Sequence, residues 1–185
     1  MHMKRLLPLI GVLLGLVWSI NAVAAAPAES RDPYKYFFEN SFGDFSEELA
    51  RAKQAGKKGL LIFFELDECP FCHRMKETVL NQENVQQYFK QHFLSFAVDI
   101  EGATEVVNFQ RKNMLAKDFA VKENRVRATP VFAFFDLEGK AIARFTGATT
   151  GVEEFLLLGQ YVADGHYKKL SFPKFKRSLQ SKKSG

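Results

Sequence analysis

The feature that most constrains the fold is an uninterrupted apolar run at 59–64, followed closely by Cys69-Pro70-Phe71-Cys72. A run that is apolar at every position predicts a strand buried on both faces, as at the centre of a parallel sheet. Residues 69–80 have a helical pattern, so the cysteines lie where a strand gives way to a helix. Pro70 suits the first turn of that helix, where its missing N–H costs nothing. The chain is therefore expected to be an α/β protein.

Cys69 and Cys72 are the only two cysteines among 185 residues. The first amides of a helix are unsatisfied and carry partial positive charge. A Cys69 thiolate at this place is stabilised, which makes it a ready nucleophile toward disulfides. The pattern therefore predicts a dithiol–disulfide oxidoreductase.

The N-terminus has the pattern of a secretory signal peptide over residues 1–24. Lys4 and Arg5 precede an apolar stretch, 6–20, and small residues follow it at 22–26. Cleavage after Ala24 fits best. An uncleaved anchor helix is the alternative, although the stretch is shorter than the roughly 20 residues that span a bilayer. We expect a periplasmic or otherwise exported protein, in an oxidising compartment.

In such a compartment a structural disulfide normally joins distant segments, whereas this pair can close only a very short loop. A short loop constrains the unfolded chain little. The remainder of the chain is long enough to bury a core without covalent links. The cysteine pair is therefore expected to serve chemistry rather than stability.

The composition, 46% hydrophobic and 25% charged, suits one soluble globular domain. We place that domain at 44–165, after a linker or N-terminal extension at 25–43 whose aromatic residues can pack onto it. Residues 166–185 form a basic tail with seven Lys or Arg and no acid. We expect this tail to be solvated and partly disordered, with weak attraction to anionic membranes as a secondary role. No nucleic-acid partner is expected.

Periodicity and turn residues predict alternating helices and strands, ending in an antiparallel return. This order predicts a three-layer α/β sandwich with a mixed central sheet flanked by helices. The segment 101–112 is ambiguous, either a hairpin or a surface insertion. The expected strands are 59–66, 93–100, 131–135 and 141–145, and the expected helices are 44–54, 69–80, 113–123 and 151–163. After 69–80 the helix restarts with Asn81 as its cap, and Val85, Tyr88 and Phe89 give it a second amphipathic stripe.

A second motif, Ala128-Thr129-Pro130, stands directly before an expected strand. With the cysteine motif and the order of elements, it makes residues 44–163 resemble the thioredoxin superfamily. The likeness is closest to exported thioredoxins of the SoxW type and to the C-terminal domain of the disulfide-interchange protein DsbD. The resemblance implies that Cys69 attacks and Cys72 resolves, without a cofactor. It also implies a cis-proline at Pro130 that faces the redox pair, with the Thr129 backbone free to pair with an extended substrate.

Two departures from the family pattern bear on the mechanism. Glu68 and the pair Pro-Phe replace the Trp and the Gly-Pro of cytosolic thioredoxins. Phe63 stands where those proteins carry a buried Asp that moves a proton to or from the second thiol. Glu65 is a candidate to replace that Asp, if strand alternation does not point it elsewhere.

The charges beside the cysteines act in opposite directions. His73 and Arg74 favour a thiolate, whereas Asp67 and Glu68 disfavour it. The two acids argue against a strong oxidant, so we favour a reductase over an oxidase or isomerase. A reductase in an oxidising compartment needs an electron source, and the resemblance implies a membrane donor of the DsbD kind. Its substrates would be disulfide-containing exported proteins, with Phe71 as an apolar contact for them.

Two other interpretations use the same residues. Cys-x-x-Cys followed by His73 is also the attachment signature of c-type haem, with Met114 as a conceivable second iron ligand. The two thiolates and His73 could instead bind copper or zinc in a metal-carrying module. We favour the redox interpretation and assign no metal ligand.

Overall fold

The computed structural model describes residues 31–183. The signal-peptide interpretation of residues 1–24 therefore lies outside the described residues. No helix among residues 31–183 is both long enough and apolar enough to cross a bilayer.

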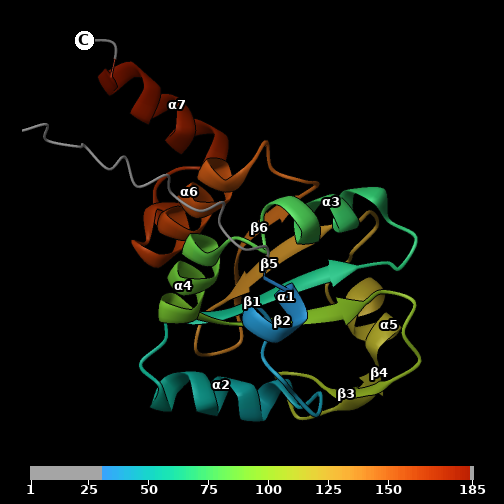
Figure 1. Ribbon diagram of the computed structural model, residues 1–185. Coiled ribbons are helices and arrows are strands. Elements are labelled where there is room, and N and C mark those ends of the chain that lie inside the picture. The colour runs from blue at the N-terminus through green and yellow to red at the C-terminus, as the bar shows by residue number, and fades with distance from the viewer. Residues whose placement is uncertain (1–30, 184–185) are drawn as a thin grey trace, which may run out of the picture.

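A four-stranded mixed sheet forms the centre of the protein, in the order β2-β1-β5-β6 (Figure 1). The strands β1 and β2 are parallel, β5 runs antiparallel to β1, and β6 runs antiparallel to β5. The bounds are β1 Gly59–Glu65, β2 Phe93–Asp99, β5 Val131–Phe135 and β6 Ala141–Thr146. The predicted mixed sheet is confirmed.

Helices cover both faces of this sheet, which makes the predicted three-layer α/β sandwich. The helices α3, α4 and α6 lie over one face, and α2 lies over the other (Figure 1). The helical elements are α1 Pro33–Tyr36, α2 Phe45–Gln54, α3 Pro70–Thr78, α4 Glu83–His92, α5 Ala116–Asp118, the π-helix Phe119–Glu123, α6 Val152–Ala163, the 3₁₀ turn His166–Lys168 and α7 Phe172–Lys183.

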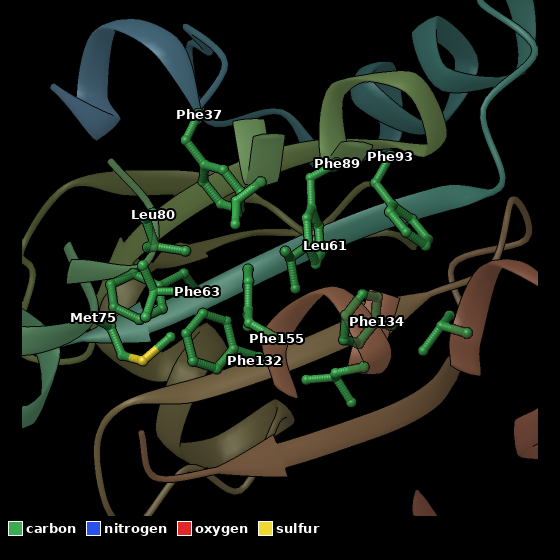
Figure 2. Close-up of a cluster of buried hydrophobic side chains, with 14 of the residues drawn as sticks. Phe37, Leu61, Phe63, Met75, Leu80, Phe89, Phe93, Phe132, Phe134 and Phe155 are labelled. Atoms are coloured by element: carbon green, nitrogen blue, oxygen red, sulfur yellow. The ribbon is translucent and has the colours of Figure 1, made fainter. Parts of the chain in front are cut away.

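All seven residues of β1 are buried, as the apolar run predicts for a central strand. Alternate side chains enter two different cores. Leu61 and Phe63 belong to the core beneath α3, α4 and α6, and Figure 2 shows them among phenylalanines from several elements. Leu60 and Ile62 enter the core beneath α2. The many phenylalanines of the chain are thus mainly core residues.

The segment 33–43 is not a free linker. Phe37 and Phe38 are buried in the first core, where Phe37 packs against Phe89 of α4 and Phe155 of α6. The Glu39 N–H also donates to the carbonyl of Ser95 on the edge strand β2 (2.7 Å). The extension therefore belongs to the fold.

The expected helix 113–123 is only partly right. Asn113–Leu115 is the strand β4, which pairs with β3 (Glu105–Val107) in a small hairpin. Short helical turns follow it, including the π-helix. A hairpin forms here instead of the start of a helix because the Asn108 side chain accepts hydrogen bonds from the N–H groups of Gln110 and Lys112. These hydrogen bonds fix the turn. The alternative of a hairpin for 101–112 is therefore the better one.

The expectation of a disordered tail is wrong for residues 166–183. The helix α7 packs on α6, with Phe172 and Phe175 each 7% exposed beside Tyr161. The reason is an apolar stripe at i, i+3 and i+7, completed by Leu179, which the run of lysines conceals. An ion pair between Lys176 and Glu154 adds to the contact.

Candidate active site

The two cysteines lie at the N-terminus of α3 and are joined by a disulfide, with Cα atoms 5.2 Å apart. Cys69 is the N-cap residue of the helix, and its Sγ accepts a hydrogen bond from the Cys72 N–H (3.1 Å). Pro70 is the first helical residue. The sequence therefore places the first sulfur at a helix N-terminus as predicted, in contact with one of the free amides.

The two sulfurs differ in their access to solvent. Cys69 is 7% exposed, whereas Cys72 is completely buried in the core with Phe63 and Met75. Of the two residues, only Cys69 keeps any exposure, so we expect an attacking protein to approach the first cysteine. This asymmetry suits a nucleophile followed by a resolving thiol.

An exposed rim surrounds the sulfurs. Phe71 is 55% exposed, and the Arg74 guanidinium lies 5.3 Å from the centre of its ring. Asp67 and Glu68 are exposed in the loop before the helix. His73 is exposed as well, and its Nε2 lies 2.5 Å from the Asp67 carbonyl oxygen. The residues expected to modulate the thiolate are thus gathered around α3.

Glu65 lies on the same face of β1 as Phe63, toward α3. Its carboxylate is 5% exposed and forms an ion pair with Lys76 (2.7 Å), while the Tyr34 hydroxyl donates to its other oxygen (2.6 Å). Lys76 also donates to the Tyr34 hydroxyl (3.0 Å). These three residues close a hydrogen-bonded triangle between the extension, β1 and α3.

The triangle changes the titration of two of its members. Burial and the hydrogen bond to Glu65 raise the pKa of Tyr34. Burial alone would lower the pKa of Lys76, but hydrogen bonds to Glu65 and Tyr34 outweigh it and raise that pKa. Sequence reasoning found Glu65 but missed Lys76 and Tyr34. The spacing of Lys76, one helical turn after Cys72, is the signal that could have found the lysine.

Pro130 lies at the same end of the sheet as the cysteines. The peptide bond between Thr129 and Pro130 is cis. The next residue, Val131, pairs with Phe64 near the end of β1, shortly before the cysteine loop. Thr129 is partly exposed and Pro130 is buried. The topology thus brings the cysteine motif and the Thr129-Pro130 motif to the same end of the sheet.

The haem and the copper or zinc interpretations use the same two sulfurs and stay predictions from the sequence. In this structure the two sulfurs are bonded to each other. Within residues 31–183, no three His, Cys, Asp or Glu side chains are grouped as a metal ion would require.

A sequence profile of the thioredoxin-like domain matches residues 45–163. No curated protein matches the sequence. Among solved structures, a thioredoxin-fold protein from Helicobacter pylori superposes with a TM-score of 0.62 at 21% identity, covering 81% of this chain and 97% of its own. The oxidoreductase DsbH gives a TM-score of 0.51 at 19% identity, covering 70% and 88%. A thioredoxin from Thermus thermophilus gives 0.51 at 23% identity, covering 64% and 83%. At these identities the likeness concerns the fold.

Proposed function

The chain belongs to the thioredoxin-like domain family, and from that premise we propose that it is an exported thiol–disulfide oxidoreductase that reduces disulfides in other exported proteins. One observation carries the proposal. The Cys69 sulfur caps the N-terminus of α3 and its residue keeps a small exposed fraction, while its bonded partner Cys72 is completely buried. The signal-peptide pattern of residues 1–24 supports export.

The reaction starts from the reduced protein. The Cys69 thiolate attacks one sulfur of a substrate disulfide, and the other substrate sulfur leaves as a thiolate that takes up a proton. The Cys72 thiol then loses its proton and attacks the Cys69 sulfur of the mixed disulfide. The second substrate sulfur leaves and is protonated in turn. Two electrons have passed to the substrate, and the Cys69–Cys72 disulfide remains.

Renewed turnover needs two electrons from a dithiol donor. We assign that role to a membrane electron donor of the DsbD kind, which would attack the Cys69 sulfur by the same exchange in reverse order. The protein itself requires no cofactor for either half of the cycle.

The charges of the exposed rim support a protein that reduces its substrates over one that oxidises them. A strongly oxidising pair requires a reduced form that is greatly stabilised. The exposed Asp67 and Glu68 carboxylates oppose negative charge on the neighbouring sulfur, against the helix amides and Arg74. This balance supports a moderate thiolate and hence a reductase.

The remaining site residues would position the substrate. An extended peptide segment can pair with the Thr129 backbone beside Pro130, in the manner of strand addition. The exposed Phe71 ring offers an apolar contact next to the reactive sulfur.

A trapping experiment tests the function. Cys72→Ala leaves the attacking sulfur without its resolving partner, so mixed disulfides with exported proteins should accumulate and be identified by mass spectrometry. Cys69→Ala is the matched control, because it keeps one thiol but removes the accessible one. Adducts in neither variant, together with no reduction of insulin by the unaltered protein, would overturn the proposal. A redox titration against glutathione then gives the direction, and a midpoint at the oxidising end would indicate an oxidase.

A further inference from the structure

The proposed redox chemistry leaves one conspicuous surface unused. The last acid in the sequence is Asp164, and the positive charges that follow it are carried on the 3₁₀ turn and on α7. Figure 1 shows α7 running outward from α6 at the periphery of the molecule. The surface is therefore a separate feature from the cysteine site.

The packing of α7 fixes which of its side chains point outward. Phe172 and Phe175 are buried against Tyr161, and Leu179 packs on the same core. At 100° per residue, Lys174 and Arg177 then fall on the opposite side of the helix, and both are exposed. The core contact thus holds these two cations toward solvent.

The preceding turn extends this surface. Lys168 and Lys169 are exposed there, and Leu170 is 40% exposed beside them. We call Lys168, Lys169, Leu170, Lys174 and Arg177 the basic face.

No described acid forms an ion pair with the cations of the basic face. Among the ion pairs of residues 31–183, none involves Lys168, Lys169, Lys174 or Arg177. In the same part of the chain, the acid that pairs with α7 is Glu154 of α6, which binds Lys176. The basic face is thus an uncompensated positive surface with a leucine exposed within it.

We propose that the basic face docks the protein on the surface of an anionic phospholipid membrane. Lysine and arginine side chains gain electrostatic energy near anionic headgroups, and an exposed apolar side chain among them can enter the headgroup region. The apolar stripe of α7 stays in the core, so the helix does not insert. Docking of this kind is reversible and weakens as salt screens the charges.

Docking would have a functional consequence if the proposed redox role is correct. It would hold the protein at the membrane where a membrane electron donor operates, and so raise the frequency of their encounters. The docking itself does not depend on the cysteines. Its test is therefore independent of the redox assay.

The experiment measures sedimentation with vesicles of phosphatidylglycerol and phosphatidylcholine, against vesicles of phosphatidylcholine alone. Each protein starts at residue 25, so that the apolar stretch 6–20 cannot insert by itself. We expect the shortened chain to keep the described fold, because within residues 31–183 every residue of the two cores lies between Phe37 and Leu179. The circular dichroism spectrum and the thermal unfolding of each variant show that it is folded, independently of any redox activity.

Two double variants change the net charge by the same amount on two different surfaces. Lys174→Glu/Arg177→Glu alters the basic face, and Lys112→Glu/Lys117→Glu alters exposed cations around the β3–β4 hairpin. We expect the unaltered protein to bind the anionic vesicles only, and the α7 variant to lose at least about 25-fold in partitioning, from roughly fivefold for each of the two cations removed. The hairpin variant should bind nearly as well as the unaltered protein.

Three results would overturn the proposal. The first is a failure of the unaltered protein to sediment with anionic vesicles at low salt. The second is equal binding to phosphatidylcholine alone. The third is an equal loss in both charge variants, which would mean that net charge, and not this face, causes binding. Leu170→Ser should weaken binding further on top of the α7 change.

Discussion

At the scale of single residues, Glu65 shows how a strand position decides a side chain's role. The β1 strand alternates between two cores, and Glu65 shares its parity with Leu61 and Phe63. Its carboxylate is therefore directed toward α3, where it forms an ion pair with Lys76 and accepts a hydrogen bond from the Tyr34 hydroxyl of α1. The alternation that could have turned it away from the cysteine side in fact places it there.

Removing the Glu65 carboxylate should destabilise the protein strongly. Glu65→Gln leaves the half-buried Lys76 without its counter-ion; breaking a fully buried pair from one side costs about 3 kcal/mol or more, so we expect a loss of about 2 kcal/mol here. Urea unfolding of the oxidised protein measures this loss. Glu65→Leu/Lys76→Met is the control, because replacing both charges leaves none unpaired. The single variants Glu65→Leu and Lys76→Met complete the cycle. A loss of unfolding free energy in the double variant that exceeds the sum of the two single losses would contradict the argument.

The same triangle predicts a loss of stability at alkaline pH. The pKa of Lys76 is raised above its ordinary value of 10.5 and that of Tyr34 above 10.0. A raised folded-state pKa contributes stability that is complete below the unfolded-state pKa and is lost as pH rises through the folded-state value. The free energy of unfolding should thus fall once pH exceeds about 10. Tyr34→Phe should make the free energy of unfolding fall less steeply above this pH, as measured by circular dichroism at increasing pH. An unchanged slope in this variant would contradict the role given to Tyr34.

At the scale of elements, the contact between α4 and α6 depends on Gly159. A Cβ built there would lie 2.7 Å from the Tyr88 ring and 2.9 Å from the Phe89 ring. The glycine lets the two helices approach, although glycine is a poor residue inside a helix.

Gly159→Ala should therefore destabilise the protein, even though alanine favours the helix by about 1 kcal/mol. Overpacking against two aromatic rings costs typically 1–3 kcal/mol, so we expect the steric cost to win. Thermal unfolding measures the outcome. Gly151→Ala is the matched control, since its Cβ would meet no atom within 4 Å. A higher melting temperature for Gly159→Ala would show that the rings move aside freely.

The helix α7 offers a second test at this scale. Phe175→Ala removes a buried ring that packs on Tyr161 and His166, and such a change costs about 3 kcal/mol or more. Arg177→Ala, two residues on and exposed, should be nearly neutral. Chemical denaturation distinguishes the two. Equal, small effects would restore the expectation of a loose tail.

At the scale of the whole molecule, the sequence predicts best where local pattern and tertiary position agree. The run 59–64 is apolar throughout because both of its faces are covered, so its place at the sheet centre could be read directly. The cysteine pair at the start of α3 was predictable for the same reason, since Pro70 and the helical period both mark the helix start.

Prediction failed where distant contacts override a local pattern. Met114 fits a helical stripe, but it pairs with Val106 across a hairpin that the Asn108 turn fixes. Phe37, Phe38 and the two phenylalanines of α7 occupy one core with β1, although they lie far apart in the chain. Lys76 and Tyr34 join Glu65 in the same way. No single stretch of sequence contains that information.

The direction of the redox reaction is also a property of the whole fold, because the stability of each redox state sets the reduction potential. A protein that is more stable reduced than oxidised is driven toward reduction, and so acts as an oxidant. Here the oxidised pair carries no charge at the N-terminus of α3. The acids of the rim oppose a thiolate in the reduced state. We therefore expect the rim to favour the oxidised form.

We therefore predict a larger free energy of unfolding for the oxidised protein than for the reduced one, by about 1.4 kcal/mol for each 30 mV that separates its potential from that of the unfolded cysteine pair. Urea unfolding with and without dithiothreitol gives both values. Cys69→Ser/Cys72→Ser, which cannot form the bond, should be insensitive to the reductant. A reduced form more stable than the oxidised one would reverse the assignment, because the same thermodynamic cycle would then make this protein an oxidase.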